Sequence, residues 1–94
     1  MIEQQETEKL VIEALKEIQS RSGRPEIEIT NQTFPLEELT NFDSLNALET
    51  ESLLAERLGQ KIDKRIFWDE KRNPLQICEV ATRLLRFLSI KPTA

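Results

Sequence analysis

Near the start of the chain, apolar residues recur every three or four positions, which is the spacing of a single helical face. Gly23 and Pro25 follow this segment, and both residue types favour the end of a helix. We therefore predict an amphipathic helix over about residues 3–21. Its apolar stripe contains Leu10, Val11, Ala14, Leu15 and Ile18.

A second periodic segment begins at Asp43 and continues to about residue 58. Asp43 is a good N-cap, because its carboxylate accepts hydrogen bonds from the free N–H groups of the first turn. Gly59 follows the last turn, where a left-handed residue commonly ends a helix. We predict that the core-facing side contains Leu45, Leu48, Ser52 and Ala55, with Leu54 and Leu58 beside it.

The last periodic segment follows Asn73 and Pro74, which suit the N-cap and the first helical position. We therefore predict a helix that starts at Pro74 and ends near residue 89, before Pro92. Its apolar stripe contains Ile77, Ala81, Leu84, Leu85 and Leu88.

The connection over residues 22–42 is long for a compact domain. It contains several apolar residues, so we expect it to pack across the bundle, with a short turn of helix at residues 35–39. The alternation Ile27-Glu28-Ile29 is too short and too isolated to build a sheet. The apolar residues of this connection are Ile27, Ile29, Phe34, Leu36, Leu39 and Phe42.

Residues 62–70 are less regular, and we expect them to form a short third helix whose Ile62, Ile66 and Phe67 close one end of the bundle. Phe67 and Trp68 are adjacent, so one of them can face the core; packing is favoured over a recognition role for this pair. The predicted fold class is all-α. Residues 1–94 form one domain, a four-helix bundle over about residues 3–89 with a short third helix and a long loop between helices one and two.

The residue inventory limits the chemistry of this chain. There is no histidine, so the commonest general base is missing and a Ser-His or Cys-His pair is impossible. A zinc site would depend on carboxylates and the single cysteine, Cys78, which is an unpromising set. A lone cysteine more often packs as a small hydrophobic residue. We therefore expect no catalysis by this chain and no metal.

Location and charge add two expectations. No apolar stretch reaches the roughly 20 residues of a membrane span, and the first nine residues are polar and acidic, so we expect a cytoplasmic monomer without a transmembrane segment. Residues 1–56 hold 13 acidic and 4 basic side chains, whereas residues 57–94 hold 4 acidic and 9 basic ones. This polarity either orients partners or reflects ordinary solvated surface. Nucleic-acid binding is disfavoured, because interleaved aromatic residues are few.

The four residues Phe42-Asp43-Ser44-Leu45 stand where the long loop meets a helix, and they resemble the Asp-Ser-Leu attachment motif of acyl carrier proteins. The upstream run Phe34-Pro35-Leu36-Glu37-Glu38-Leu39 is similar to that family's approach to its serine. The downstream run Leu53-Leu54-Ala55-Glu56-Arg57-Leu58-Gly59 resembles its second helix and exit. The resemblance covers roughly residues 5–88.

This resemblance implies a carrier of acyl or aminoacyl groups, held as thioesters on a phosphopantetheine arm attached to Ser44, in lipid, polyketide or peptide biosynthesis. Asp43 would cap the helix and help a phosphopantetheinyl transferase recognise the site, and Leu45 would contact that enzyme. The implied partners also include acyl- or aminoacyl-activating and condensing enzymes. The residues expected to contact partners are Glu49, Glu51 and Glu56.

Two other interpretations remain open. Asp43 and Ser44 both favour a helix start, so the motif is also consistent with a plain helix N-terminus. In that case the chain is an unmodified helical interaction module or scaffold subunit, or a small helical subunit that works only within an enzyme complex. Mass spectrometry of the expressed protein distinguishes these alternatives from a carrier.

Overall fold

The computed structural model describes residues 4–21, 23, 28–39, 42–62 and 65–89. It contains four helices, α1 (Gln4–Arg21), α2 (Pro35–Glu38), α3 (Ser44–Leu58) and α4 (Ile77–Ser89). The described residues form no β-strand, only one isolated bridge between Trp68 and Pro74. The predicted all-α class with four helices is confirmed. Within these ranges, no helix has both the length and the apolar character that a membrane span requires.

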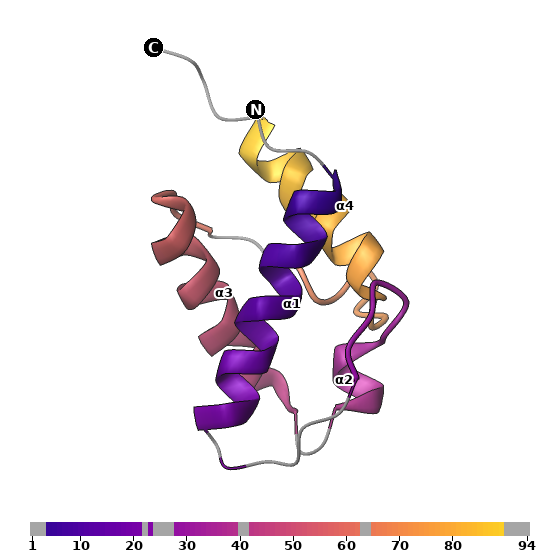
Figure 1. The fold of residues 1–94 in the computed structure, drawn as a ribbon. Helices are drawn as coiled ribbons and strands as arrows, with labels where there is room; N and C mark the ends of the chain where they lie inside the picture. The colour runs from indigo at the N-terminus through magenta and orange to yellow at the C-terminus, as the bar shows by residue number, and fades with distance from the viewer. Residues whose placement is uncertain (1–3, 22, 24–27, 40–41, 63–64, 90–94) are drawn as a thin grey trace.

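Helix α1 lies between α3 and α4 and packs against both (Figure 1). Its predicted apolar stripe is confirmed: four of the five residues are buried and Leu10 is half-buried. Beside this stripe, at the contact with α3, Glu17 forms ion pairs with Arg21 and with Arg57 of α3. The buried residues of the stripe are Val11, Ala14, Leu15 and Ile18.

Helix α3 has the predicted bounds. Asp43 is its N-cap, and Gly59 ends it in the left-handed conformation with a φ of 64°. Glycine adopts this conformation without the steric cost that a Cβ imposes, so the chain can turn away directly after Leu58.

The predicted core-facing side of α3 is wrong. Leu45 is 64% exposed, Leu48 is 40% exposed and Ser52 is also exposed. The buried side is instead partly polar, because its polar groups have partners within the fold: the Thr50 hydroxyl, for example, donates to the carbonyl of Asn46 over 2.8 Å. The buried residues are Asn46, Ala47, Thr50, Glu51, Leu53 and Leu54.

The predicted start of the last helix at Pro74 is also wrong, because α4 begins at Ile77. Pro74 is held in the bridge to Trp68, and the N–H of Leu75 donates to the carbonyl of Phe67 over 3.1 Å. These pairings keep the backbone before α4 extended. The predicted stripe of α4 is otherwise correct, since Ile77, Ala81 and Leu84 are buried while Leu85 and Leu88 are half-buried.

The short turn of helix predicted at residues 35–39 is confirmed as α2. The short third helix expected over residues 62–70 is wrong, because the described residues 65–76 contain no helix. Ile66 and Phe67 of this segment are nevertheless fully buried in the core, and Ile62 is half-buried against it. Phe67 meets Phe42 edge to face, with 5.9 Å between the ring centroids.

The long connection packs across the bundle as expected, with Ile29, Leu39 and Phe42 buried; Ile27 lies outside the described residues. It also meets the start of α4. The N–H groups of Ile77 and Cys78 donate to loop carbonyls at residues 33 and 31, over 2.9 and 2.8 Å. Because the first N–H groups of a helix have no partner within it, these bonds satisfy two of them.

Candidate functional site

The candidate site is the first turn of α3, which a reciprocal pair of hydrogen bonds holds in place. The Asp43 carboxylate accepts from the N–H of Asn46 over 3.1 Å, and the Asn46 side-chain oxygen accepts from the N–H of Asp43 over 3.4 Å. This is a capping box with asparagine in place of the usual glutamate or glutamine. The Asn46 amide also donates to the Glu49 carboxylate over 2.9 Å. The sequence prediction of Asp43 as the N-cap is confirmed.

Ser44 is the first residue of α3 and its side chain is exposed. Asp43 already accepts from the N–H of Asn46, and its carbonyl accepts from the N–H of Ala47 over 3.0 Å. The N–H groups of Ser44 and Leu45 have no acceptor within the helix, because they come before the first intrahelical bond. The serine hydroxyl therefore stands beside backbone donors at the positive end of a helix.

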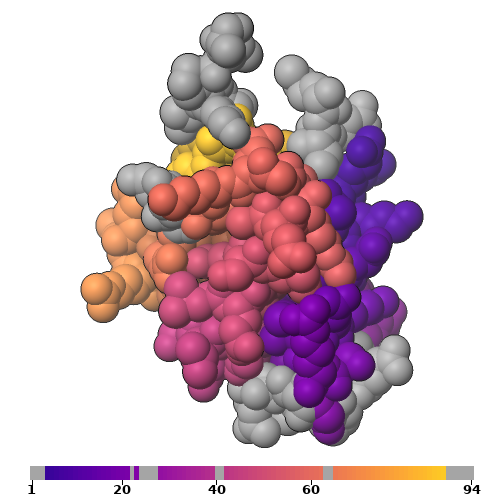
Figure 2. Space-filling model, turned by 90° about the vertical axis from the view of Figure 1, so that its left-hand side faces the viewer, coloured from indigo at the N-terminus to yellow at the C-terminus, as the bar shows by residue number. Residues whose placement is uncertain are grey.

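The outward side of α3 forms a large part of one face of the molecule (Figure 2). On this side the chain exposes Leu45, one residue after Ser44, and Leu48, one turn further along. Glu49 and Glu56 are exposed as well, in agreement with their expected position on the surface. Exposed acidic and apolar residues therefore follow Ser44 along one helix.

Glu51 is not part of this exposed surface, and its predicted role as a surface contact is wrong. Its side chain is only 3% exposed. One carboxylate oxygen accepts from the N–H of Ile66 over 3.1 Å, and the other lies 3.2 Å from the guanidinium of Arg65. Glu51 thus faces the segment that precedes α4 rather than a partner in solution.

The Glu51 carboxylate is incompletely satisfied. Its oxygen beside Arg65 is buried and forms no hydrogen bond of acceptable geometry, so the Arg65 contact is an ion pair only. Burial raises the pKa of Glu51, and the hydrogen bond from Ile66 and the charge of Arg65 oppose this effect. Sequence inspection missed this ion pair, because 13 residues separate Glu51 from Arg65 along the chain and no local pattern links them.

Cys78 is half-buried and unpaired, consistent with a boundary position. Its thiol lies 4.0 Å from the side-chain oxygen of Gln76. Trp68 is half-buried beside the fully buried Phe67, so these adjacent residues divide between surface and core as predicted. The described residues contain no group of three potential metal-ligating side chains.

Comparisons of this chain with protein-family models, with curated proteins and with solved structures find no match. The features that favour a carrier role are therefore residues 42–45 and their position at the start of α3.

Proposed function

We propose that this chain is an acyl or peptidyl carrier protein that is modified with phosphopantetheine on Ser44. The observation that carries the proposal is the exposure of Ser44 at the first position of α3, directly after the capping residue Asp43. An attachment residue must be reachable by a separate enzyme, and its arm must extend from the bundle. A serine at the exposed end of a helix meets both requirements.

The residues around Ser44 fit a phosphodiester. The attached phosphate is an anion beside the N–H groups of Ser44 and Leu45, which have no acceptor within α3. The helix dipole favours an anion at this end by about 0.3–1 kcal/mol. The Asp43 carboxylate is held by Asn46, so the nearest negative charge has a fixed position. When bound, phosphopantetheine supplies a thiol that carries the cargo as a thioester.

The chain itself needs no catalytic group for this role. During attachment the Ser44 oxygen attacks the pyrophosphate of coenzyme A, the adenosine bisphosphate part leaves, and the phosphopantetheinyl transferase takes the hydroxyl proton. The lack of histidine in this chain is therefore no obstacle. Leu45 and the exposed carboxylates of Glu49 and Glu56 supply apolar and acidic contacts for this enzyme and for activating and condensing enzymes. Glu51 is excluded from this set by its burial.

A second candidate function is an unmodified interaction module. The exposure of Leu45 and Leu48 favours it, because two leucines one turn apart on a helix are also a suitable surface for a partner helix. In this alternative, Ser44 is only the first helical residue and the capping box stabilises the helix that presents the leucines.

Mass spectrometry after co-expression with a broad-specificity phosphopantetheinyl transferase distinguishes the two candidates. The carrier proposal expects one added phosphopantetheine in the wild type and in Ser52→Ala, but none in Ser44→Ala. Ser52 is a matched control, because it is also an exposed serine of α3. If the wild type stays unmodified with several transferases and excess coenzyme A, the interaction module becomes the better explanation.

A further inference from the structure

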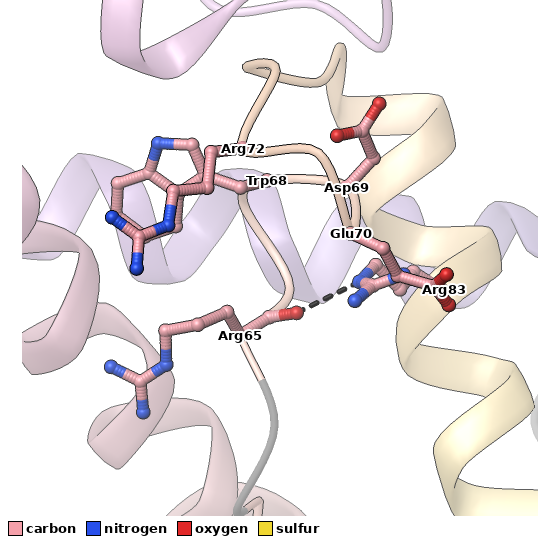
Figure 3. Close-up of a pocket in the computed structure, with 6 residues that line it drawn as sticks. All are labelled: Arg65, Trp68, Asp69, Glu70, Arg72 and Arg83. Atoms are coloured by element: carbon pink, nitrogen blue, oxygen red, sulfur yellow. Dashed lines mark hydrogen bonds between the residues drawn. The ribbon is translucent and has the colours of Figure 1, made fainter.

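A cavity of about 500 Å³ lies between residues 65–72 and helix α4, on a part of the chain that the carrier proposal does not use. Pockets that hold small molecules generally measure about 300–1,000 Å³. Figure 3 shows the side chains that line it. Arg65, Trp68 and Arg72 lie on one side of the view, and Asp69, Glu70 and Arg83 lie on the other.

A tight turn positions the residues of one wall. The Asp69 carboxylate accepts from the N–H groups of Lys71 and Asn73, over 2.8 and 2.9 Å, and from the side-chain amide of Asn73 over 3.2 Å. These hydrogen bonds lower the pKa of Asp69, and the bond from the Asn73 N–H has the largest effect. The carboxylate is therefore directed into its own turn. Arg72 completes the turn with a φ of 68°, an unfavourable conformation for a residue with a Cβ.

The guanidinium groups of the cavity are only partly neutralised. Arg65 pairs with Glu51 and is about half exposed, so it keeps N–H donors for a ligand. Arg83 donates to the carbonyl of Arg65 over 2.8 Å and lies 5.1 Å from the ring centroid of Phe87, and it forms no ion pair with a carboxylate among the described residues. Arg72 likewise forms no ion pair with any residue that the structure describes. The cavity lining therefore combines three guanidinium groups with the carboxylates of Asp69 and Glu70. Of these guanidinium groups, those of Arg72 and Arg83 form no ion pair within the described part of the chain and remain available to a ligand.

Trp68 adds a flat apolar surface to this cationic wall. Its indole is half-buried and lines the cavity, and in Figure 3 it lies on the same side as Arg65 and Arg72. Aromatic rings bind nucleobases by stacking, and guanidinium groups bind phosphate oxygens through paired N–H donors. A phosphate alone uses only the arginines, and an apolar ring alone uses only the indole.

We propose that this cavity binds a nucleoside phosphate, with the base against Trp68 and the phosphates at Arg65 and Arg72. The proposal is independent of any modification of Ser44, because none of the lining residues belongs to α3. It also explains a use for the basic second half of the chain, where 9 of the 13 basic residues lie. Nucleic-acid binding is not implied, because the site has the dimensions of a small molecule.

Tryptophan fluorescence measures this binding directly, because Trp68 is the only tryptophan and the chain has no tyrosine. The titration uses adenosine diphosphate without divalent cations, with excitation at wavelengths that adenine does not absorb. We expect saturable quenching with a dissociation constant of about 0.05–1 mM at low ionic strength. Adenosine and inorganic phosphate should each bind at least about tenfold more weakly, since each lacks one half of the recognised chemistry.

Arg72→Gly is the best variant, because glycine adopts a φ of 68° without strain and so preserves the turn while it removes the guanidinium. It should weaken adenosine diphosphate binding about three- to tenfold. Arg21→Ala is the control for charge, because Arg21 is an exposed arginine of α1 outside the cavity, and it should bind like the wild type. Ser44→Ala should also bind like the wild type.

Trp68→Ala, measured by calorimetry, should lose most of the affinity if the base stacks on the indole. The proposal is wrong if binding does not saturate up to about 10 mM adenosine diphosphate. Equal affinity for pyrophosphate would also overturn it, because it shows an anion site without base recognition. A third contrary result is an unchanged affinity in Arg72→Gly with a native circular dichroism spectrum. Binding of an acidic peptide in place of adenosine diphosphate also overturns it.

Discussion

The carboxylate of Glu51, in the middle of α3, accepts a hydrogen bond from the backbone N–H of Ile66 over 3.1 Å. This bond joins the middle of α3 to the segment that leads to α4, and it anchors that segment. Ile66 and Phe67 are fully buried directly at this point. A polar bond therefore fixes where these two apolar side chains enter the core.

Removal of the Glu51 side chain should destabilise the fold. In Glu51→Ala the N–H of Ile66 loses its acceptor in a buried setting, and this should lower the free energy of unfolding by about 1–3 kcal/mol. Glu56→Ala is the control, because Glu56 is exposed on the same helix and should change stability by no more than about 0.5 kcal/mol. Urea denaturation measures both values. Equal effects of the two substitutions would show that the Ile66 bond contributes nothing.

The pKa of Glu51 predicts a particular dependence of stability on pH. Because this pKa is raised in the folded state above the ordinary value of 4.5, the folded protein binds more protons than the unfolded chain between 4.5 and the raised pKa. The contribution of Glu51 to stability is therefore greatest below pH 4.5 and declines as the pH rises through this interval. Glu51→Gln removes the titration, so the wild-type stability minus that of Glu51→Gln should fall with increasing pH. A difference that rises, or stays constant, contradicts the raised pKa.

Substitutions of Leu84 in α4 and Leu48 in α3 test which faces of these helices are buried. Leu84→Ala should lower the free energy of unfolding by about 2–5 kcal/mol, because Leu84 is fully buried in the core between α4 and its neighbours. Leu48→Ala should cost less than about 1 kcal/mol, because this side chain is 40% exposed. Chemical denaturation of both variants gives the comparison. A cost for Leu48→Ala as large as that for Leu84→Ala would restore the face predicted from the sequence.

The helix boundaries of α1 and α3 were predictable because local chemistry sets them. Asp43 caps the first turn of α3 and Gly59 ends its last turn, and both residue types are common at these positions. The buried face of α3 was not predictable in the same way. Thr50 can be buried because its hydroxyl bonds to the backbone of its own helix. Glu51 can be buried because it accepts a hydrogen bond from Ile66 and forms an ion pair with Arg65. Hydropathy alone assigns both residues to the surface.

The start of α4 was missed for a similar reason. Asn73 and Pro74 have the residue types of a helix start, but tertiary pairing overrides this preference. Asn73 instead closes the turn at Asp69, and Pro74 lies opposite Trp68. The candidate site at Ser44 could be proposed from the sequence because its motif is contiguous. The cavity lined by Arg65, Trp68 and Arg83 was not, because it joins side chains from two separate segments.

Substitutions of Asp43 separate capping from recognition. Asp43→Ala should lower the free energy of unfolding by about 0.5–2 kcal/mol, because it removes the acceptor for the N–H of Asn46. Asp43→Asn keeps an acceptor oxygen and should cost less than about 0.5 kcal/mol. If the transferase reads the charge of Asp43, Asp43→Asn should nevertheless be modified about three- to tenfold more slowly, the size of one charged contact. If Asp43→Asn is modified at the wild-type rate, Asp43 acts only as a helix cap.

The exposed acidic residues of α3 test recognition by the transferase. Glu49 accepts a hydrogen bond from Asn46, so charge reversal there would also disturb the first turn, and Glu49→Gln is the better substitution because it keeps an acceptor. We expect the double variant Glu49→Gln/Glu56→Gln to be modified more slowly than the wild type, with a weaker dependence on ionic strength. Exposed charges contribute only about 0.2–1 kcal/mol each, so the effect should fall mainly on the association rate.

The matched control for this experiment is Lys61→Gln, which removes one exposed charge of the opposite sign just beyond α3. Arg65 is unsuitable as a control, because its loss leaves the buried carboxylate of Glu51 without its ion pair. The initial rate of modification is measured across a salt series for all three proteins, with helicity checked by circular dichroism. If Glu49→Gln/Glu56→Gln behaves like the wild type while Lys61→Gln is slowed, the transferase approaches the basic end of α3, and the acidic surface is not the docking face.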